Sequence, residues 1–225
     1  MTIDPLAMNG NINVQPSDDT TRTLKTLFHL PILRVQLEQD TAKSTDITPS
    51  TTSPTLTSLI NYNRASTPLI EIITPPVLTS GFQAAAAFSK IIELLRVTGT
   101  TTGDLHNGAM RCDVNISLGR ASERTEIKNL NSVRAVREAC NFEIQSQVRE
   151  YEEEGRLVAL RTTKRWDGER TIVTREKEGE KDYRYDHFLL PCIPEKAVWS
   201  EVSGVGIGKR LMVGTCLMRI YRLLS

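Results

Sequence analysis

Hydrophobic and polar positions follow two different periods along this chain, which predict two helices and a set of strands. Apolar residues recur every three or four positions from about residue 80 to 97 and again from about 132 to 154, a spacing typical of an amphipathic helix. A Ser, Thr or Asn precedes each segment, and Gly99 and Gly155 follow them closely. Such residues cap the two ends of a helix, so we expect both helices to begin and end there.

Runs of alternating or β-branched residues predict the strands. In the segment 112–117 the apolar side chains fall on one face and Asp113, Asn115 and Ser117 on the other, as in a half-buried strand. The predicted strands cover residues 32–38, 68–74, 112–117, 124–128, 157–165, 171–176 and 182–188. Because the two helices are interspersed among pairs and triplets of strands, we expect an α+β fold with a mostly antiparallel sheet.

The composition changes along the chain and divides it into four parts. Residues 1–30 are polar with little periodicity, and we expect a loose segment or an edge of something larger. Residues 31–195 form the predicted domain, interrupted at 41–58, where 11 of 18 residues are Ser or Thr. A stretch with so little to bury is expected to be a flexible insertion. Residues 196–225 form an atypical tail.

Charge and cysteine content exclude several classes of protein. The 28 Lys and Arg balance 27 Asp and Glu, which argues against binding nucleic acid by charge alone. The four Cys form no Cys-x-x-Cys pair, so a zinc ribbon, a redox dithiol and a disulfide scaffold are poor interpretations. No segment is apolar enough to span a membrane, and the first 30 residues contain no clear leader.

Four carboxylates stand inside predicted strands rather than in loops: Glu38, Glu71, Asp113 and Glu126. A charged residue in a strand ordinarily faces solvent. Glu71 is different, because its neighbours on both sides are apolar and its face is therefore expected to meet something other than water. A buried carboxylate needs a cation, a metal ion or hydrogen bonds.

Basic residues accompany these acids: Arg64, Arg111, Arg124 and Lys128. Carboxylates can hold Mg²⁺, and Arg and Lys can hold phosphates, so the pattern fits a site for a magnesium nucleotide. Surface salt bridges are the alternative, and the residues alone leave both open. The glycines of 204–209 do not have the spacing of a phosphate-binding loop.

Five sequence strings, taken together and in order, resemble the B subunit of the glutamyl-tRNA(Gln) amidotransferase. The sequence of the first string most resembles the mitochondrial form of fungi. The strings are VQLEQDTAKS (35–44), NYNRASTPLIEIITPP (61–76), GAMRCDVNISL (108–118), RTEIKNLNSVRAV (124–136) and KDYRY (181–185). The resemblance covers roughly residues 32–190. It implies a cradle-shaped α+β domain related to glutamine synthetase, here incomplete.

The resemblance also implies a reaction and its partners. The family uses ATP and Mg²⁺ to phosphorylate the γ-carboxylate of Glu misattached to tRNA(Gln), and ammonia then displaces the phosphate to give Gln-tRNA(Gln). An amidase subunit releases that ammonia from glutamine, and a small third subunit completes a heterotrimer. From this resemblance we expect a ligase of the mitochondrial matrix with no membrane partner.

The roles implied for single residues follow from the same strings. The catalytic set would be Glu38, Glu71, Arg64 and Lys128. The nucleotide- and phosphate-binding set would be Arg111, Arg124 and Asn115. The metal set would be Glu38, Glu71, Asp113 and Glu126, with Glu38 and Glu71 nearest the ion and the other two behind them or at the nucleotide.

The chain also departs from the family. The family begins with a strand that carries Glu and His ligands, followed by a Cys-rich stretch, and residues 1–30 contain neither. Residues 204–225 match nothing in the helical and tRNA-binding parts that follow in the family. We therefore expect a chain truncated at both ends. The alternative function is a non-catalytic fragment or scaffold that docks the amidase subunit, and a generic RNA-binding module is a third hypothesis.

Overall fold

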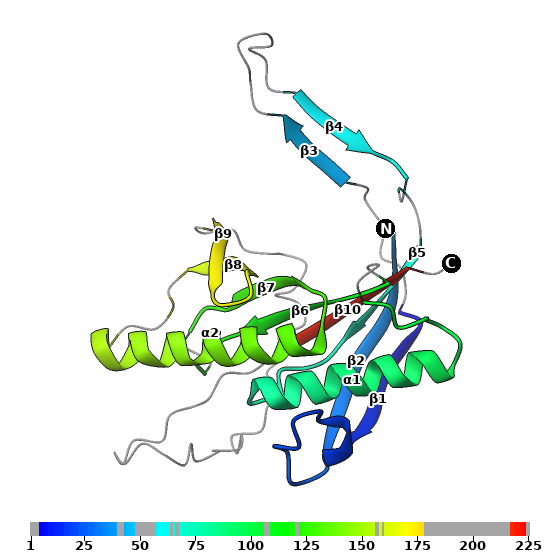
Figure 1. Cartoon of the computed structure of the whole chain (residues 1–225), viewed down its shortest axis with the longest axis horizontal. Coiled ribbons are helices and arrows are strands. Elements are labelled where there is room, and N and C mark those ends of the chain that lie inside the picture. Colours follow the sequence, from blue (N-terminus) through cyan, green and yellow to red (C-terminus); the bar gives the residue numbers. More distant parts are fainter. Residues whose placement is uncertain are drawn as a thin grey trace.

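The fold is an eight-stranded sheet with two helices packed on one face (Figure 1). The computed structural model describes residues 5–39, 43–47, 57–63, 65, 68–105, 109–119, 122–155, 158, 160–177 and 217–223. The strand order is β1-β2-β5-β10-β6-β7-β8-β9, and within it only β7 and β8 run parallel. These features confirm the predicted α+β class and its mostly antiparallel sheet.

The strands of the large sheet are β1 (Ala7–Val14), β2 (Phe28–Gln39), β5 (Pro68–Ile73), β6 (Met110–Ile116), β7 (Thr125–Leu130), β8 (Arg161–Trp166), β9 (Thr171–Lys177) and β10 (Leu217–Leu223). Two further strands, β3 (Lys43–Ile47) and β4 (Thr57–Asn61), pair with each other in a separate antiparallel ladder. A short 3-10 helix spans Pro16–Asp18. The predicted strand at 182–188 lies outside the described residues.

Both predicted helices form with the expected caps. Helix α1 spans Gly81–Val97, and the Ser80 hydroxyl accepts a hydrogen bond from the Gln83 amide. Helix α2 spans Val133–Glu154, begins after Ser132 in the same way, and ends at Gly155 in the left-handed conformation, with φ of 65°. The helices therefore begin and end where local sequence predicts, because capping depends on neighbours in the chain.

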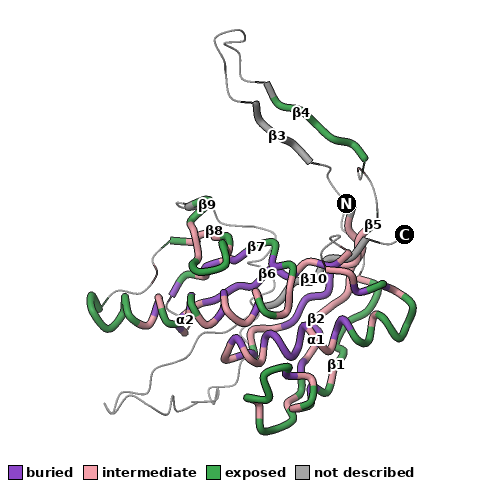
Figure 2. The backbone as a smooth tube through the Cα atoms, in the orientation of Figure 1, coloured by how far each residue is buried: buried purple, intermediate pink, exposed green. Residues whose placement is uncertain are grey.

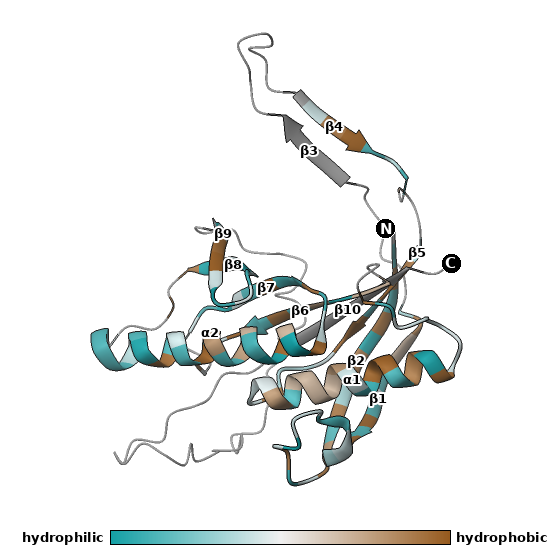
Figure 3. Ribbon diagram, viewed as in Figure 1, coloured by the Kyte–Doolittle hydropathy of each residue, from teal (hydrophilic) through white to brown (hydrophobic). Residues whose placement is uncertain are grey.

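The hydrophobic core lies between the two helices and the central strands (Figure 2). Phe88 and Ile91 of α1 and Val136 of α2 are buried against Cys112 and Val114 of β6. Burial raises the pKa of the Cys112 thiol, with smaller contributions from Cys140 and Asp113, so this thiol stays neutral and packs as a small apolar group. Toward its C-terminus α2 becomes hydrophilic as it leaves the core (Figure 3). No helix in the described residues is long and apolar enough to cross a membrane.

Three segments differ from their sequence expectation. Residues 7–14, expected to be loose or an edge of something larger, form the edge strand β1, whose side chains are mostly exposed and so show no apolar periodicity. Part of the Ser/Thr-rich insertion forms β3 and the start of β4, because backbone pairing needs no apolar side chains. Part of the atypical tail forms β10, a central strand between β5 and β6.

Candidate functional site: the polar face of the sheet

The sheet face opposite the helices carries almost all the candidate residues that the structure describes. In strands, residues two positions apart share a face, and directly paired residues of neighbouring strands lie on the same side. Ile70, Ile72, Val114 and Ile127 pack in or against the helix-side core. The residues that alternate with them point the other way and define what we call the polar face: Gln36 and Glu38 of β2, Glu71 of β5, Arg111, Asp113 and Asn115 of β6, and Glu126 and Lys128 of β7.

The first cluster on the polar face joins β2 and β5. Glu71 is fully buried, as its apolar neighbours predicted. Its carboxylate accepts a short hydrogen bond from the Gln36 side chain, and the same Nε2 lies 3.3 Å from Glu38 Oε1. Gln36 is the direct cross-strand partner of Glu71, and Glu38 is the diagonal one. Two carboxylates thus lie within reach of one bound group.

The second cluster joins β6 and β7. Asn115 and Glu126 are direct cross-strand partners, and Lys128 Nζ lies 3.5 Å from Glu126 Oε2. Asp113 and Asn115 are each only 5% exposed. Asp113 Oδ1 accepts a hydrogen bond from the Asn129 backbone N–H at 2.8 Å. Asn115 Oδ1 is buried and has no hydrogen-bond partner within the part of the chain that the structure describes, and a buried acceptor of this kind needs a donor or a cation.

The two clusters are neighbours on one face but not one compact centre. Strand β10 lies between β5 and β6. With about 4.8 Å between adjacent strands, β5 and β6 are about 10 Å apart and β2 and β7 about 19 Å. Among the described residues no group of three or more His, Cys, Asp or Glu side chains is close enough to hold a metal ion together. The four predicted metal residues therefore divide into two pairs, Glu38 with Glu71 and Asp113 with Glu126.

The predicted cations are placed less uniformly. Arg111 of β6 is half-buried. Its cross-strand partner is Tyr221 of β10, and Tyr221 pairs on its other side with Glu71 of β5. Lys128 is partly exposed. Arg124 precedes β7, and its carbonyl accepts a hydrogen bond from the Thr162 amide at 3.4 Å. Arg64 lies outside the described residues.

Sequence reasoning missed several residues that share the polar face. Gln36 has the same strand parity as Glu38, and that parity was the available signal. Thr163 and Arg165 of β8 pair with Glu126 and Lys128, and Arg175 of β9 pairs with Thr163. No local pattern could have identified these last three, because only the register of the sheet brings them beside β7.

The residues of the polar face fit Mg²⁺ and a phosphate chemically. Mg²⁺ prefers one or two carboxylates, with water and phosphate oxygens filling the remaining positions. Glu38 and Glu71 supply such carboxylates. The Asn115 side chain, whose Oδ1 has no hydrogen-bond partner among the described residues, and the nearby Lys128 and Arg111 can contact a phosphate or the group to which it is attached.

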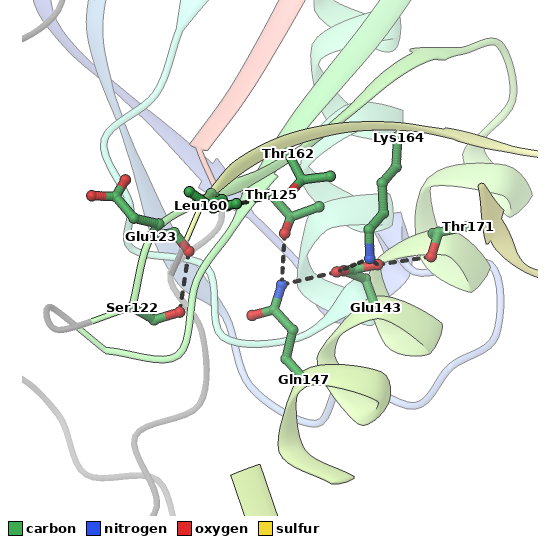
Figure 4. Close-up of polar contacts among 9 residues, drawn as sticks. All are labelled: Ser122, Glu123, Thr125, Glu143, Gln147, Leu160, Thr162, Lys164 and Thr171. Carbon is green, nitrogen blue, oxygen red and sulfur yellow. Dashed lines mark hydrogen bonds and ion pairs between the residues drawn. The ribbon is translucent and has the colours of Figure 1, made fainter. Parts of the chain in front are cut away.

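A separate polar cluster lies on the helix side of the sheet and is not part of this site (Figure 4). Glu143 of α2 is fully buried. It accepts hydrogen bonds from Lys164 Nζ at 2.9 and 3.1 Å, from Thr171 at 2.8 Å and from Gln147 at 2.9 Å. Gln147 also donates to Thr125 at 3.1 Å. These contacts of Glu143 with described residues are all made inside the fold, which gives it a structural role.

Comparison with known proteins identifies the family of this chain. A family model described as the GatB/GatE catalytic domain matches residues 1–197. The chain belongs to this family. The match includes residues 1–30, which the sequence motifs alone left outside the resemblance. The edge strand β1 is therefore part of the family's domain.

Relatives of this chain carry the names of amidotransferase subunits. One is named as the B subunit of an aspartyl/glutamyl-tRNA(Asn/Gln) amidotransferase, from Synechococcus sp. (strain JA-2-3B'a(2-13)); it is 37% identical over 197 residues, which are 84% of this chain and 38% of the relative. Two are named as the mitochondrial B subunit of a glutamyl-tRNA(Gln) amidotransferase. That of Yarrowia lipolytica is 41% identical over 75% of this chain and 29% of its own length. That of Clavispora lusitaniae is 39% identical over 80% of this chain and 32% of its own length. The chain thus spans about a third of the length of these relatives.

Proposed function

We propose that this chain acts as the catalytic domain of the B subunit of a glutamyl-tRNA(Gln) amidotransferase. Its reaction would be the ATP-dependent phosphorylation of the glutamyl carboxylate on misacylated Glu-tRNA(Gln), followed by amidation with ammonia derived from glutamine. The observation that carries the proposal is the buried Glu71, held by Gln36 beside Glu38 on the same sheet face as Asn115, Glu126 and Lys128. The family and the names of the relatives support the same reaction.

The chemistry explains why acids and bases are both needed. A carboxylate is a poor acyl donor until one of its oxygens becomes part of a good leaving group, and a phosphoryl group supplies that. Bound Mg²⁺ would neutralise charge on the nucleotide phosphates, and Glu38 and Glu71 are the residues we assign to hold it. We assign Asp113 and Glu126, which form the second cluster across β10, to the side of the nucleotide.

The cationic and amide side chains have complementary tasks. We assign Arg111, Arg124 and Asn115 to the nucleotide phosphates, and Arg64 and Lys128 to the glutamyl end and the transferring group. Cations placed where charge develops stabilise it most when water is excluded. The burial of Asp113 and Asn115 is consistent with such a site, and exclusion of water also protects an acyl phosphate from hydrolysis.

The partners and the location follow from the same proposal. The chain would assemble with an amidase subunit that supplies ammonia and with a small third subunit, and it would bind misacylated tRNA(Gln). The two fungal relatives are named mitochondrial, which supports a mitochondrial matrix location. Fractionation of cells that express a tagged chain checks this, and a signal outside the mitochondrial fraction would contradict it.

The test compares Glu71→Gln with the matched control Glu150→Gln, which removes the same charge from an exposed position on α2. Each variant is assembled with an amidase subunit and the third subunit, and conversion of Glu-tRNA(Gln) is measured beside glutamine hydrolysis. We expect Glu71→Gln to lower conversion about 100-fold or more, as the loss of a group that stabilises the transition state does, while glutamine hydrolysis is largely retained. The control should be unchanged.

Two other results would redirect the proposal. Equal conversion by Glu71→Gln and the unmodified chain would remove Glu71 from the site. Stable binding to the amidase subunit with no conversion by any form of the chain would leave only the scaffold function.

A further inference from the structure

Strand β7 contains a bulge at the point where it carries the second cluster. Ile127 and Leu130 are both buried in the helix-side core, although they are three positions apart and a regular strand would put them on opposite faces. The register accounts for this. Ile127 pairs with Val114 and Leu130 with Cys112, so β7 uses one residue more than β6. The extra residue falls at Lys128–Asn129.

The backbone at the bulge has the geometry that this extra residue requires. Asn129 has φ of 61°, in the left-handed region that Asn tolerates better than most residues. A bulge leaves a backbone group out of the regular ladder. Here the Asn129 N–H donates to Asp113 Oδ1 at 2.8 Å. The carboxylate of β6 thus takes the place of a ladder carbonyl, inside a position that is only 5% exposed.

The bulge lets Leu130 return to the core while Glu126 and Lys128 stay on the polar face. Glu126 and Lys128 lie together there, with 3.5 Å between Nζ and Oε2, and Lys128 is paired with Arg165 of β8. If β7 paired with β6 regularly, without the bulge, Leu130 would fall on the polar face, since a one-residue slip reverses the side of every later side chain. Burial of Leu130 and placement of the Glu126–Lys128 pair are therefore compatible only while the bulge is held.

We propose that Asp113 is a positioning residue: it clamps the β7 bulge through the Asn129 N–H and so sets the Glu126–Lys128 pair. Its oxygen acts as a hydrogen-bond acceptor, and direct coordination of a metal ion is not its task. The consequence for ligand binding rests on the proposed function, in which that pair faces a phosphate. The clamp itself does not depend on that function.

Four variants of the full chain test whether Asp113 acts as a hydrogen-bond acceptor for the Asn129 N–H or as a direct ligand. Asp113→Asn keeps an acceptor oxygen but loses the charge, whereas Asp113→Ala loses both. Asn129→Gly keeps the N–H and favours positive φ, whereas Asn129→Ala keeps the N–H and strains the backbone. Two quantities are measured for each: the hydrogen-exchange rate of the residue 129 amide, and the Kd for ATP in the presence of excess Mg²⁺.

The clamp predicts opposite results for the two members of each pair. Asp113→Ala should speed exchange of the Asn129 amide about tenfold or more and raise the Kd about 10- to 100-fold, the range typical of residues that orient ligands without touching them. Asp113→Asn should keep the exchange rate of the Asn129 amide within about twofold of the unmodified chain, and it should raise the Kd less than Asp113→Ala does. Asn129→Gly should also be nearly unchanged, and Asn129→Ala should resemble Asp113→Ala in milder form.

Two results would overturn the clamp. Unchanged amide exchange in Asp113→Ala would show that Asp113 does not hold the bulge. A Kd raised equally in Asp113→Asn and Asp113→Ala, with amide exchange normal in the Asn variant, would make Asp113 a ligand. If Asp113→Ala does not fold, Asp113→Asn and the two Asn129 variants still decide. If the unmodified chain binds no nucleotide, the proposed function fails and the exchange measurement alone still tests the clamp.

Discussion

Single polar side chains in this fold often replace a missing backbone partner, and Asp19 is a clear example. Its carboxylate accepts hydrogen bonds from the backbone N–H groups of Thr21, Thr23 and Leu24 and from the Thr21 hydroxyl, at 2.6 to 2.9 Å. Asp19 is 3% exposed. Burial alone would raise its pKa, but these four hydrogen bonds outweigh burial and lower the pKa below its ordinary value. The ionised carboxylate therefore holds the loop between the 3-10 helix and β2.

We expect Asp19→Ala to destabilise the chain by about 1–3 kcal/mol, because several donors in a partly buried loop lose a charged acceptor. Urea unfolding at pH 7 measures this change. The exposed Asp167→Ala, in the turn between β8 and β9, also removes a carboxylate that accepts two backbone hydrogen bonds. Because that turn is exposed, it should cost less. Equal effects would mean that burial of Asp19 adds nothing.

The lowered pKa of Asp19 also predicts a dependence on pH. A carboxyl group whose pKa is lower when folded stabilises the fold fully above its unfolded value of about 3.9, and this contribution is lost as the pH falls through the folded pKa. The stability gap between the unmodified chain and Asp19→Asn should therefore be larger at pH 6 than at pH 3. Unfolding curves at both pH values check this, and a constant gap would contradict it.

Packing between elements depends on a close approach of the two helices. The Gly81 N–H donates to Asn141 Oδ1 at 2.9 Å, so a side chain of α2 satisfies the first amide of α1. A Cβ atom at position 81 would lie 2.4 Å from the Arg137 carbonyl oxygen and 2.6 Å from Asn141 Oδ1. Because the first of these atoms is backbone, it cannot rotate away.

Gly81→Ala should therefore destabilise the fold by about 1–3 kcal/mol, as overpacking does, although Ala is the better helix former. The double variant Gly81→Ala with Asn141→Ala should not recover the stability, since the clash with the Arg137 carbonyl persists. Thermal unfolding of both variants measures this. Recovery in the double variant would show that only the Asn141 side chain was in the way.

A second link between elements is the Glu143 cluster of Figure 4, which ties α2 to β7, β8 and β9. Lys164→Met should cost about 3–5 kcal/mol, because it leaves the buried carboxylate without its cation. The exposed pair on the same helix, Arg134 with Glu138 at 2.7 Å, provides the control. Arg134→Met should cost less than about 1 kcal/mol. Urea unfolding of the two variants compares them, and similar costs would contradict the assigned role of Glu143.

At the scale of the whole molecule, the integrity of the large sheet depends on β10, which lies between β5 and β6 although it is far from both along the chain. Strand β10 pairs with β5 over residues 219–223 and with β6 over residues 217–222, and so it joins the two halves of the sheet. Its position also sets the spacing between the two acidic clusters. Removing it would leave β5 and β6 with unpaired edges inside the sheet, a state that favours aggregation.

A chain shortened to residues 1–216 should therefore lose its cooperative unfolding transition, whereas a chain shortened to residues 1–223 should keep it. Circular dichroism during thermal unfolding, together with light scattering, distinguishes the two. A cooperative transition of unchanged midpoint in the shorter chain would mean that β10 contributes nothing to the stability of the sheet.

Much of the fold was predictable because its signals are local. Both helices, their caps, and the polar and apolar sides of β6 follow from periods of 3.6 and 2 in the sequence. The burial of Glu71 was predictable too, because its apolar neighbours on both sides indicate that its side chain does not face solvent. Strand β1 and strand β10 were not predictable in this way. The first is an exposed edge strand with little apolar content, and the second lies among residues with no pattern that points to its partners.

The candidate site shows the same division. Sequence alone determined the types of residue and the strands on which they stand, because alternation assigns each side chain to a face. Only the tertiary structure decided that Gln36 lies between Glu38 and Glu71, that β10 separates this pair from Asp113 and Glu126, and that a bulge after Lys128 returns Leu130 to the core. These facts depend on strand order and register, which are set by contacts between residues far apart in the chain and leave no local trace in it.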